Sequence, residues 1–295
     1  MVVLCIGYNN LKLISITESG FTDTTRGRFL HKNFIGKKFG TKVWSQNNKG
    51  YAYALKPDPH LFSLSLDHKT QILFQADISM VLHLLNLKQG DTVFESGTGS
   101  CSLTFSLSER VGEKGQVFTF EFNKGRYENA QEVTTNMKMG NVRCHWQNVL
   151  ENGFVISEFL ENSPEDQKLK ISENSEILPL DEIKNINYQR MANAVFLDLP
   201  SPELVVPHAD KVLKKGGRLC SFSPCIEQIQ VTAKAMARLG YSKIQTVEIL
   251  EREMKSRSIG NCGLNGDLRK HQVGLFVDQN DQKMHTGYLI FGTRI

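Results

Sequence analysis

The sequence lacks the features that mark several specialised classes of protein. No stretch approaches the roughly 18 consecutive apolar residues that span a bilayer. The apolar N-terminal residues have neither a basic region nor a small-residue cleavage site, so we do not expect them to be a signal peptide. We expect a soluble, intracellular protein. The six cysteines include no C-x-x-C pair, and their spacing indicates neither a disulfide framework nor a zinc site.

What is present is an average globular composition with an uneven distribution of charge. The 295 residues are 40% hydrophobic and 22% charged, and this length favours two domains or one large one. The net charge is +4, but residues 1–70 carry 10 Lys and Arg against 4 Asp and Glu, whereas residues 158–187 carry 3 against 8. A basic body with an acidic insertion fits an anionic partner such as nucleic acid, although a solvated lysine-rich surface would give the same counts.

Residues 1–65 predict a small β-rich, barrel-like domain. Short apolar runs are separated by turn residues, of which Gly7-Tyr-Asn-Asn10 is the clearest example. No long helical period interrupts these runs before Lys56-Pro-Asp-Pro59 ends the pattern. We predict strands over residues 2–6, 11–16, 42–44 and 51–55.

Residues 66–295 predict an α/β domain built on a doubly wound, Rossmann-like parallel sheet, because apolar strands alternate with helices. The last two strands have no helix between them, which predicts an antiparallel hairpin at one edge. The acidic stretch 158–187 is an insertion between the third and fourth strands. We predict strands over 92–95, 115–122, 142–146, 194–199, 217–223, 243–250 and 287–293, and helices ending near residues 85, 110, 139, 213 and 239.

The first strand of this sheet leads into a glycine-rich turn, Glu95-Ser-Gly-Thr-Gly-Ser100. Gly97 and Gly99 permit a tight turn and let the backbone approach a ligand. Ser102 stands where a dinucleotide-binding loop has its third glycine, which favours a nucleotide-like cofactor without a diphosphate. A plain strand-to-helix turn would explain the same glycines.

Two carboxylates close the second and fourth strands. Glu121 lies 22 residues after Gly99, where such an acid accepts hydrogen bonds from ribose hydroxyls; an ordinary surface glutamate is the alternative. Asp198 ends an apolar strand, and a carboxylate there is costly to bury unless it is paired or used. The alternative is an aspartate that caps the next helix. Ligands of doubly wound sheets bind beyond the carboxyl ends of the strands, at the topological switch point, so we expect the ligand near these strand ends.

Further segments carry a resemblance to a known family. They are the Glu95–Ser100 turn, Phe196-Leu-Asp-Leu-Pro-Ser-Pro202, Cys220-Ser-Phe-Ser-Pro-Cys-Ile-Glu-Gln228, His285-Thr-Gly-Tyr-Leu289 and His68-Lys-Thr-Gln-Ile-Leu73. The chain resembles class I S-adenosylmethionine-dependent methyltransferases, and within them the catalytic subunit of eukaryotic tRNA (adenine(58)-N1)-methyltransferase. The similarity extends over nearly the whole chain.

The resemblance implies methyl transfer from S-adenosylmethionine to N1 of adenine 58 in the T-loop of tRNA, with Asp198 as the catalytic acid. It implies no metal, a non-catalytic homologous subunit in a heterotetramer, and a nuclear location. It places the cofactor at Leu73, Glu95, Ser96, Gly97, Thr98, Gly99, Ser100, Ser102, Glu121, Arg126, Asn148, Val149 and Asp198. It places tRNA at Gly50, Tyr51, Gln71, Pro200, Ser221, Phe222, Ser223, Pro224, Cys225, Ile226, Glu227, Gln228 and His285.

Two positions and one insertion, the acidic stretch 158–187, depart from the family's pattern. Cys101 replaces a glycine that is usual in the loop, and we expect it to narrow the pocket for the methionine part of the cofactor. Asn148 stands where an acid commonly faces the adenine amino group, and its side-chain oxygen can still accept that hydrogen bond.

Three other functions remain open on the sequence alone. One is a non-catalytic RNA-binding scaffold of the same fold, although such a scaffold need not retain Glu121 and Asp198 together. A second is a methyltransferase acting on proteins or small molecules, which the basic β-rich segment disfavours. The third is a dehydrogenase, which Ser102 disfavours.

Overall fold

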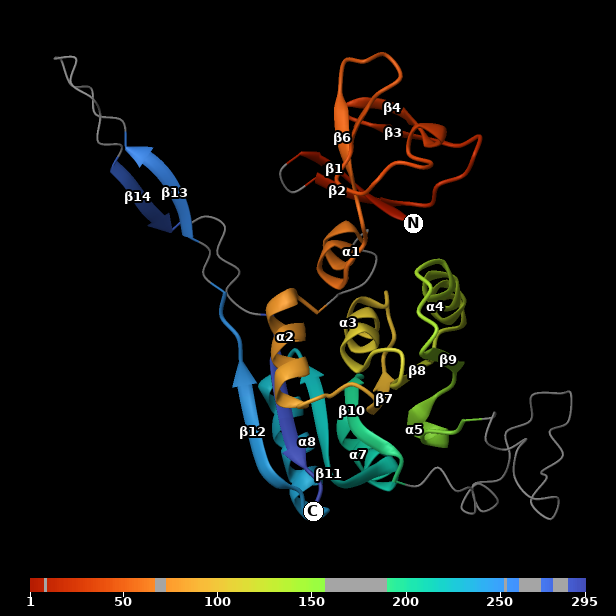
Figure 1. Cartoon of the computed structure of the whole chain (residues 1–295). Coiled ribbons are helices and arrows are strands. Elements are labelled where there is room, and N and C mark those ends of the chain that lie inside the picture. The colour runs from red at the N-terminus through yellow and green to blue at the C-terminus, as the bar shows by residue number, and fades with distance from the viewer. Residues whose placement is uncertain (8–9, 67–72, 157–189, 252–253, 260–271, 278–285) are drawn as a thin grey trace, which may run out of the picture.

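The chain folds into an N-terminal antiparallel β region and a larger α/β region, shown in Figure 1 as a computed structural model. The structure describes residues 1–7, 10–66, 73–156, 190–251, 254–259, 272–277 and 286–295. The predicted acidic insertion at 158–187 lies outside the described residues, and the predicted domain boundary near residue 65 adjoins another such segment, 67–72. In the described parts of the chain, no helix has the length and apolar character needed to cross a membrane.

The N-terminal region contains a four-stranded antiparallel sheet in the order β2-β1-β6-β5, which confirms the four predicted strands. Its apolar side chains alternate along the strands, so one face packs on a small core that includes Leu4, Phe29 and Val43. A separate hairpin, β3–β4, was not predicted because its short strands carry few apolar residues. The bounds are β1 Val2–Gly7, β2 Asn10–Ile14, β3 Phe21–Thr24, β4 Gly27–Leu30, β5 Lys42–Trp44 and β6 Tyr51–Leu55.

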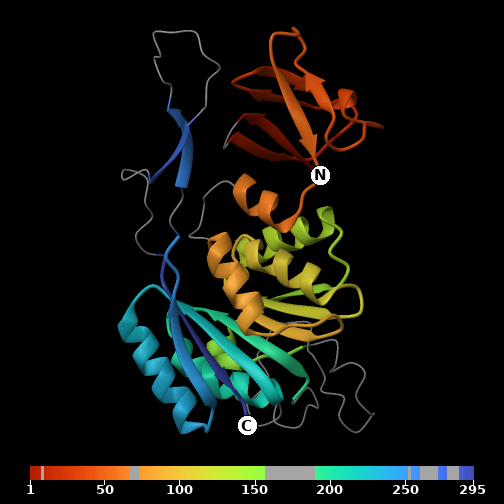
Figure 2. The ribbon, with the colours of Figure 1, turned by 60° about the vertical axis from the view of Figure 1, so that its left-hand side comes forward.

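A short helix that was also not predicted, α1 (Pro59–Ser65), joins the two regions. Asp58 caps it by accepting a hydrogen bond from the Leu61 amide (2.7 Å), and the proline pair that ends the strand pattern therefore begins a helix. The ring of Phe62 packs edge-on against Phe105, with centroids 5.5 Å apart. Figures 1 and 2 show α1 between the β region and the helices of the α/β region.

The α/β region is organised around a seven-stranded sheet in the order β12-β15-β11-β10-β7-β8-β9. β7 to β11 are parallel, whereas β15 pairs antiparallel with both β11 and β12, as expected for the predicted antiparallel edge. The chain runs outward from β7 to β9 and then crosses back to β10, so the topological switch point lies between β7 and β10. The bounds are β7 Thr92–Ser96, β8 Gln116–Glu121, β9 Val142–Trp146, β10 Ala192–Asp198, β11 Leu213–Ser223, β12 Ser242–Glu248 and β15 Tyr288–Thr293.

Helices cover both faces of this sheet, as the doubly wound prediction requires. One core cluster joins α2, α3 and α4 to the sheet, and a second joins α5, α7 and α8. Alternate residues of β10 point into the two clusters: Phe196 belongs to the first and Leu197 to the second. The bounds are α2 Gln75–Leu84, α3 Ser102–Val111, α4 Lys124–Asn136, α5 Val149–Asn152, α7 Pro202–Val212 and α8 Ile226–Arg238.

The loop predicted between the last two strands contains a further pair of strands. β13 (Met254–Ile259) and β14 (Gln272–Val277) form an antiparallel ribbon of their own. Figure 2 shows this ribbon projecting from the sheet toward the side on which the N-terminal region lies. These strands were not predicted, because Met254–Ile259 is mostly polar and Gly274 interrupts the apolar residues of Gln272–Val277.

Candidate active site

The glycine-rich turn after β7 lies against the end of β10, at the switch point of the sheet. Gly97 has φ +97°, a conformation that side chains rarely adopt, and a Cβ there would overlap the backbone carbonyl oxygen of Asp198. The Gly97 amide donates to the carbonyl oxygen of Phe120 in β8 (3.0 Å). The absence of a side chain at Gly97 therefore lets the ends of β7, β8 and β10 come into direct contact.

Replacing Gly97 with alanine is expected to lower the free energy of unfolding by about 3 kcal/mol or more, since left-handed strain and a backbone clash add together. Gly90 is a matched control, because it has φ +88° and a Cβ added there would meet no described atom within 4 Å. Gly90→Ala should cost only about 1–2 kcal/mol. Urea denaturation of both variants measures the difference; equal losses would show that the contact with Asp198 has no energetic weight.

Glu121, at the end of β8, connects the glycine turn to helix α4. Its Oε1 accepts hydrogen bonds from the Asn123 amide (2.9 Å) and from Nε and Nη2 of Arg126 (3.0 and 2.9 Å). Its Oε2 accepts one from the Gly99 amide (3.1 Å). A carboxylate oxygen has two lone pairs, so Oε2 can accept one more donor, and this buried carboxylate is oriented for a ligand at the turn.

Glu95 is a second carboxylate, buried beneath the turn with 1% of its surface exposed. Thr104 donates its hydroxyl to Oε2 of Glu95 (2.6 Å), and Thr119 also bonds to this side chain. Burial raises the pKa of Glu95 to about 7, and the nearby charges of Asp198 and Glu121 add to the shift. Neither threonine partner was predicted, since a buried hydroxyl follows no periodic pattern in the sequence.

Asp198 is the third carboxylate, and its side chain is open to solvent at the end of β10. Protein atoms packed around the carboxylate exclude part of its hydration shell, and this desolvation raises its pKa to about 6. The negative charge of Glu121 adds to the shift. It does not cap the next helix: the N-cap of α7 is Ser201. Among the described residues, no hydrogen bond to the Asp198 carboxylate is found, so it is available to a ligand.

The remaining predicted cofactor residues lie around these carboxylates, and they differ in how far their polar atoms are already used in hydrogen bonds. The Asn148 oxygen accepts from the Leu150 amide (3.1 Å) and caps α5, which leaves one lone pair for a ligand. The Ser102 hydroxyl instead bonds the Ser63 hydroxyl of α1 (2.7 Å). Ser96, Thr98, Val149 and Leu73 are buried, Ser100 lies in the turn, and Arg126 is held by Glu121.

Cys101, the departure from the family's glycine, is fully buried and has φ +63° as the N-cap residue of α3. A side chain therefore occupies a backbone conformation that glycine adopts without cost. The expected narrowing of the cofactor pocket stays a prediction.

The predicted tRNA residues fall into two groups. Beside Asp198, Ser221, Phe222 and Ser223 end β11 and are buried, whereas the following residues Pro224, Cys225, Ile226 and Glu227 are exposed at the start of α8. Nε2 of Gln228 donates to the carbonyl oxygen of Pro200 (3.0 Å), which ties the two loops together. Gly50 and Tyr51 lie apart from these, in the N-terminal region. Gln71 and His285 lie outside the described residues.

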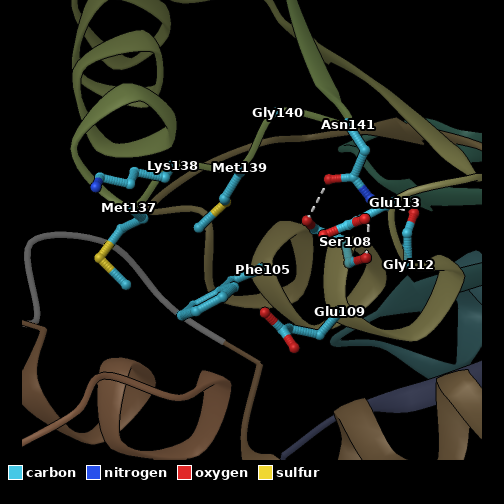
Figure 3. Close-up of a pocket in the computed structure, with 10 residues that line it drawn as sticks. All are labelled: Phe105, Ser108, Glu109, Gly112, Glu113, Met137, Lys138, Met139, Gly140 and Asn141. Atoms are coloured by element: carbon cyan, nitrogen blue, oxygen red, sulfur yellow. Dashed lines mark hydrogen bonds between the residues drawn. The ribbon is translucent and has the colours of Figure 1, made fainter.

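A separate cavity of about 540 Å³ opens at the opposite end of the strands, and Figure 3 shows the residues that line it. Its lining residues lead into the first residues of β8 and β9, so it lies at the amino ends of the strands. Asn141 is already satisfied there, since its amide donates to the carbonyl oxygens of Ser108 (3.0 Å) and Gly112 (2.9 Å). None of the predicted site residues lines this cavity, and within the described chain no cluster suited to a metal ion is found.

The family model described as the tRNA methyltransferase complex GCD14 subunit matches residues 50–163 and 183–270. The chain belongs to this family. A tRNA (adenine(58)-N1)-methyltransferase catalytic subunit of Dictyostelium discoideum is 34% identical over 256 residues, which cover 87% of this chain and 73% of that protein. The subunit of the same name from Cryptococcus neoformans is 36% identical over 255 residues, 85% of this chain. The chain spans about half, 52%, of the length of that relative.

Solved structures confirm the fold of this GCD14 family member. A SAM-dependent O-methyltransferase from Thermotoga maritima superposes with a TM-score of 0.74 at 21% identity, covering 100% of this chain and 92% of the other. The tRNA (m1A58) methyltransferase TrmI from Aquifex aeolicus gives a TM-score of 0.66 at 21% identity, covering 100% and 96%. The chain therefore has the fold of S-adenosylmethionine-dependent methyltransferases, as the resemblance implied.

Proposed function

We propose that this chain is a catalytic subunit that transfers a methyl group from S-adenosylmethionine to N1 of adenine 58 in tRNA. The observation that carries the proposal is the Asp198 carboxylate, unpaired among the described residues and open to solvent directly beside the Gly97 turn. Relatives at 34% and 36% identity carry the name of this activity. The positions of Glu95 and Glu121 beside the same turn count against a scaffold that has lost its site.

The residues at the turn fit this cofactor. A Cβ on Gly99 would meet no described atom within 4 Å, so a ligand has room to approach the backbone of the turn there. Oε2 of Glu121 has a lone pair for a ribose hydroxyl. Asn148 offers an oxygen to the adenine amino group, and the acids Glu95 and Asp198 favour a cationic ligand nearby. When bound, the cofactor supplies an electrophilic methyl group on a sulfonium.

Asp198 would act on the methyl acceptor by electrostatics. Methylation at N1 makes adenine cationic, and a carboxylate that accepts a hydrogen bond from the N6 amino group stabilises this charge more in the transition state than in the ground state. N1 lies on the base-pairing edge, so the base must leave its stack to reach Asp198, at a cost of a few kcal/mol. Contacts of the basic N-terminal region with phosphates would offset this cost.

The partner and the location belong to the same proposal. We infer a heterotetramer with a non-catalytic homologous subunit, and a nuclear location. The family description, which names a complex, supports the partner. The nuclear location rests on the resemblance alone.

The test is methyl transfer from labelled S-adenosylmethionine to an unmodified tRNA transcript, with and without the candidate partner subunit. We expect label at position 58, and none on a transcript in which adenine 58 is replaced by guanine. Label that persists on the guanine transcript, or that appears on protein instead of RNA, would overturn the proposed substrate.

A further inference from the structure

One face of the N-terminal sheet carries a cluster of exposed aromatic side chains on β5 and β6. Trp44, Tyr51 and Tyr53 keep 47%, 37% and 42% of their surface exposed. Trp44 pairs with Tyr51 in the antiparallel register and Lys42 pairs with Tyr53, so the four side chains share one face. Large aromatic side chains left in solvent on a sheet whose other face is a packed core point to a binding surface.

The aromatic rings form a connected platform with a cation above it. The rings of Trp44 and Tyr51 lie 5.5 Å apart and those of Tyr51 and Tyr53 lie 5.8 Å apart, both edge to face. Nζ of Lys42 lies 3.9 Å from the centroid of Tyr51 and 4.4 Å from that of Trp44. These contacts fix the rings in place before any ligand arrives, which lowers the entropy lost on binding.

The surroundings of the platform are basic. Lys49 lies two residues before Tyr51 and is exposed. Residues 1–66 hold nine Lys and Arg but three Asp and Glu. Of these acids, Asp23 pairs with Arg28 (2.7 Å) and Asp58 caps α1. The charge suits a polyanion.

The N-terminal region, which carries the platform, and the candidate active site are on the same side of the α/β region. Ser63 of α1 bonds Ser102, at the first turn of α3, directly after the glycine-rich turn. α1 also packs under the sheet that carries the platform, and Figures 1 and 2 show the N-terminal region on this side. One RNA molecule can therefore contact both.

We propose that Trp44, Tyr51 and Tyr53 stack unpaired nucleotides of the RNA substrate, while Lys42 and its basic neighbours contact the adjacent phosphates. The proposal rests on the proposed function for the identity of the RNA, and it adds to the expected contact of Tyr51 a mode of binding and two further residues. Bases stack on aromatic rings whatever their sequence, so the platform would hold tRNA loops without reading them. A duplex, whose bases are already stacked, would gain only the phosphate contacts.

Tryptophan fluorescence tests the platform directly. The chain has two tryptophans, so the Trp146→Phe protein reports on Trp44 alone. We expect a single-stranded RNA oligonucleotide to quench this signal, and the same sequence annealed into a duplex to quench it much less. Equal quenching by both forms, or no quenching by either, would overturn stacking. An acidic peptide that quenches as well as RNA would also overturn it.

Steady-state methylation of tRNA by the full chain, with its partner where activity requires it, gives the second test. Trp44→Ala and Tyr53→Ala should each raise KM for tRNA about tenfold, with kcat and cofactor affinity unchanged. Trp44→Phe should restore most of the affinity, whereas Trp44→Leu should not. Phe39→Ala, an exposed aromatic outside the platform, is the matched control. Normal KM for the alanine variants would refute the platform, whereas absent methylation with intact quenching would refute the proposed function alone.

Discussion

Replacing Asp198 with asparagine is expected to lower the rate of methyl transfer by roughly 100- to 1,000-fold, while the affinity for S-adenosylmethionine changes by less than about threefold. Asparagine keeps the size of the side chain, and its oxygen can still accept from the adenine amino group, but the negative charge is lost. That charge is what stabilises a base turning cationic. Single-turnover transfer to tRNA and calorimetric titration of the cofactor measure the two quantities.

The same residue sets a pH dependence. The pKa of Asp198 is raised to about 6, so lowering the pH below this value protonates the carboxyl group and removes its charge. The single-turnover rate at low cofactor concentration should fall about tenfold per pH unit below the pKa, and Asp198→Asn should be flat in that window. Glu203→Gln, which removes a charge from the first turn of α7, should behave as the wild type. Equal losses of rate and of cofactor affinity in Asp198→Asn would make the residue structural.

The second large effect is expected at Glu121. Glu121→Gln should weaken the binding of S-adenosylmethionine by about 100-fold, since a hydrogen bond between a charged group and a ribose hydroxyl is worth about 1.5–3 kcal/mol. Part of this loss of affinity comes from a less ordered glycine-rich turn, because Oε2 of Glu121 accepts a hydrogen bond from the Gly99 amide. Titration of the cofactor against the purified protein measures the affinity.

A matched variant separates this effect from general changes of charge on helix α4. Glu128→Gln removes an exposed carboxylate of α4, and should leave the cofactor affinity unchanged. The folding of Glu121→Gln is checked by its thermal midpoint. A well-folded variant that binds the cofactor as tightly as the wild type would refute the ribose role of Glu121.

The centre of the sheet was predictable because β7, β8 and β10 are buried on both faces and therefore appear as continuous apolar runs. Ala194-Val-Phe-Leu197 is such a run, and it coincides with the buried part of β10. The hairpin β3–β4 and the ribbon β13–β14 were missed because strands of mixed polarity resemble loops. Helix α1 was missed because seven residues are too few to show a helical period.

The candidate site was predictable as far as topology alone could place it. Gly97 and Asp198 are distant in sequence, yet the carboxyl ends of adjacent parallel strands must meet, and the structure confirms the contact. The hydrogen bonds of Thr104 and Ser63 could not be foreseen, because they depend on how a helix is rotated and on where α1 sits. Those details come from packing, which no local pattern encodes.

The hydroxyl pair between Ser63 and Ser102 makes the two regions of the chain mechanically dependent on each other. A small domain attached by a flexible linker could rotate freely. Here α1, which packs under the β region, is hydrogen-bonded to α3, which begins directly after the glycine-rich turn. Tilting the β region must therefore stretch this fastening or drag the first turn of α3 along. A ligand that binds the N-terminal β region and tilts it would therefore also shift the glycine-rich turn.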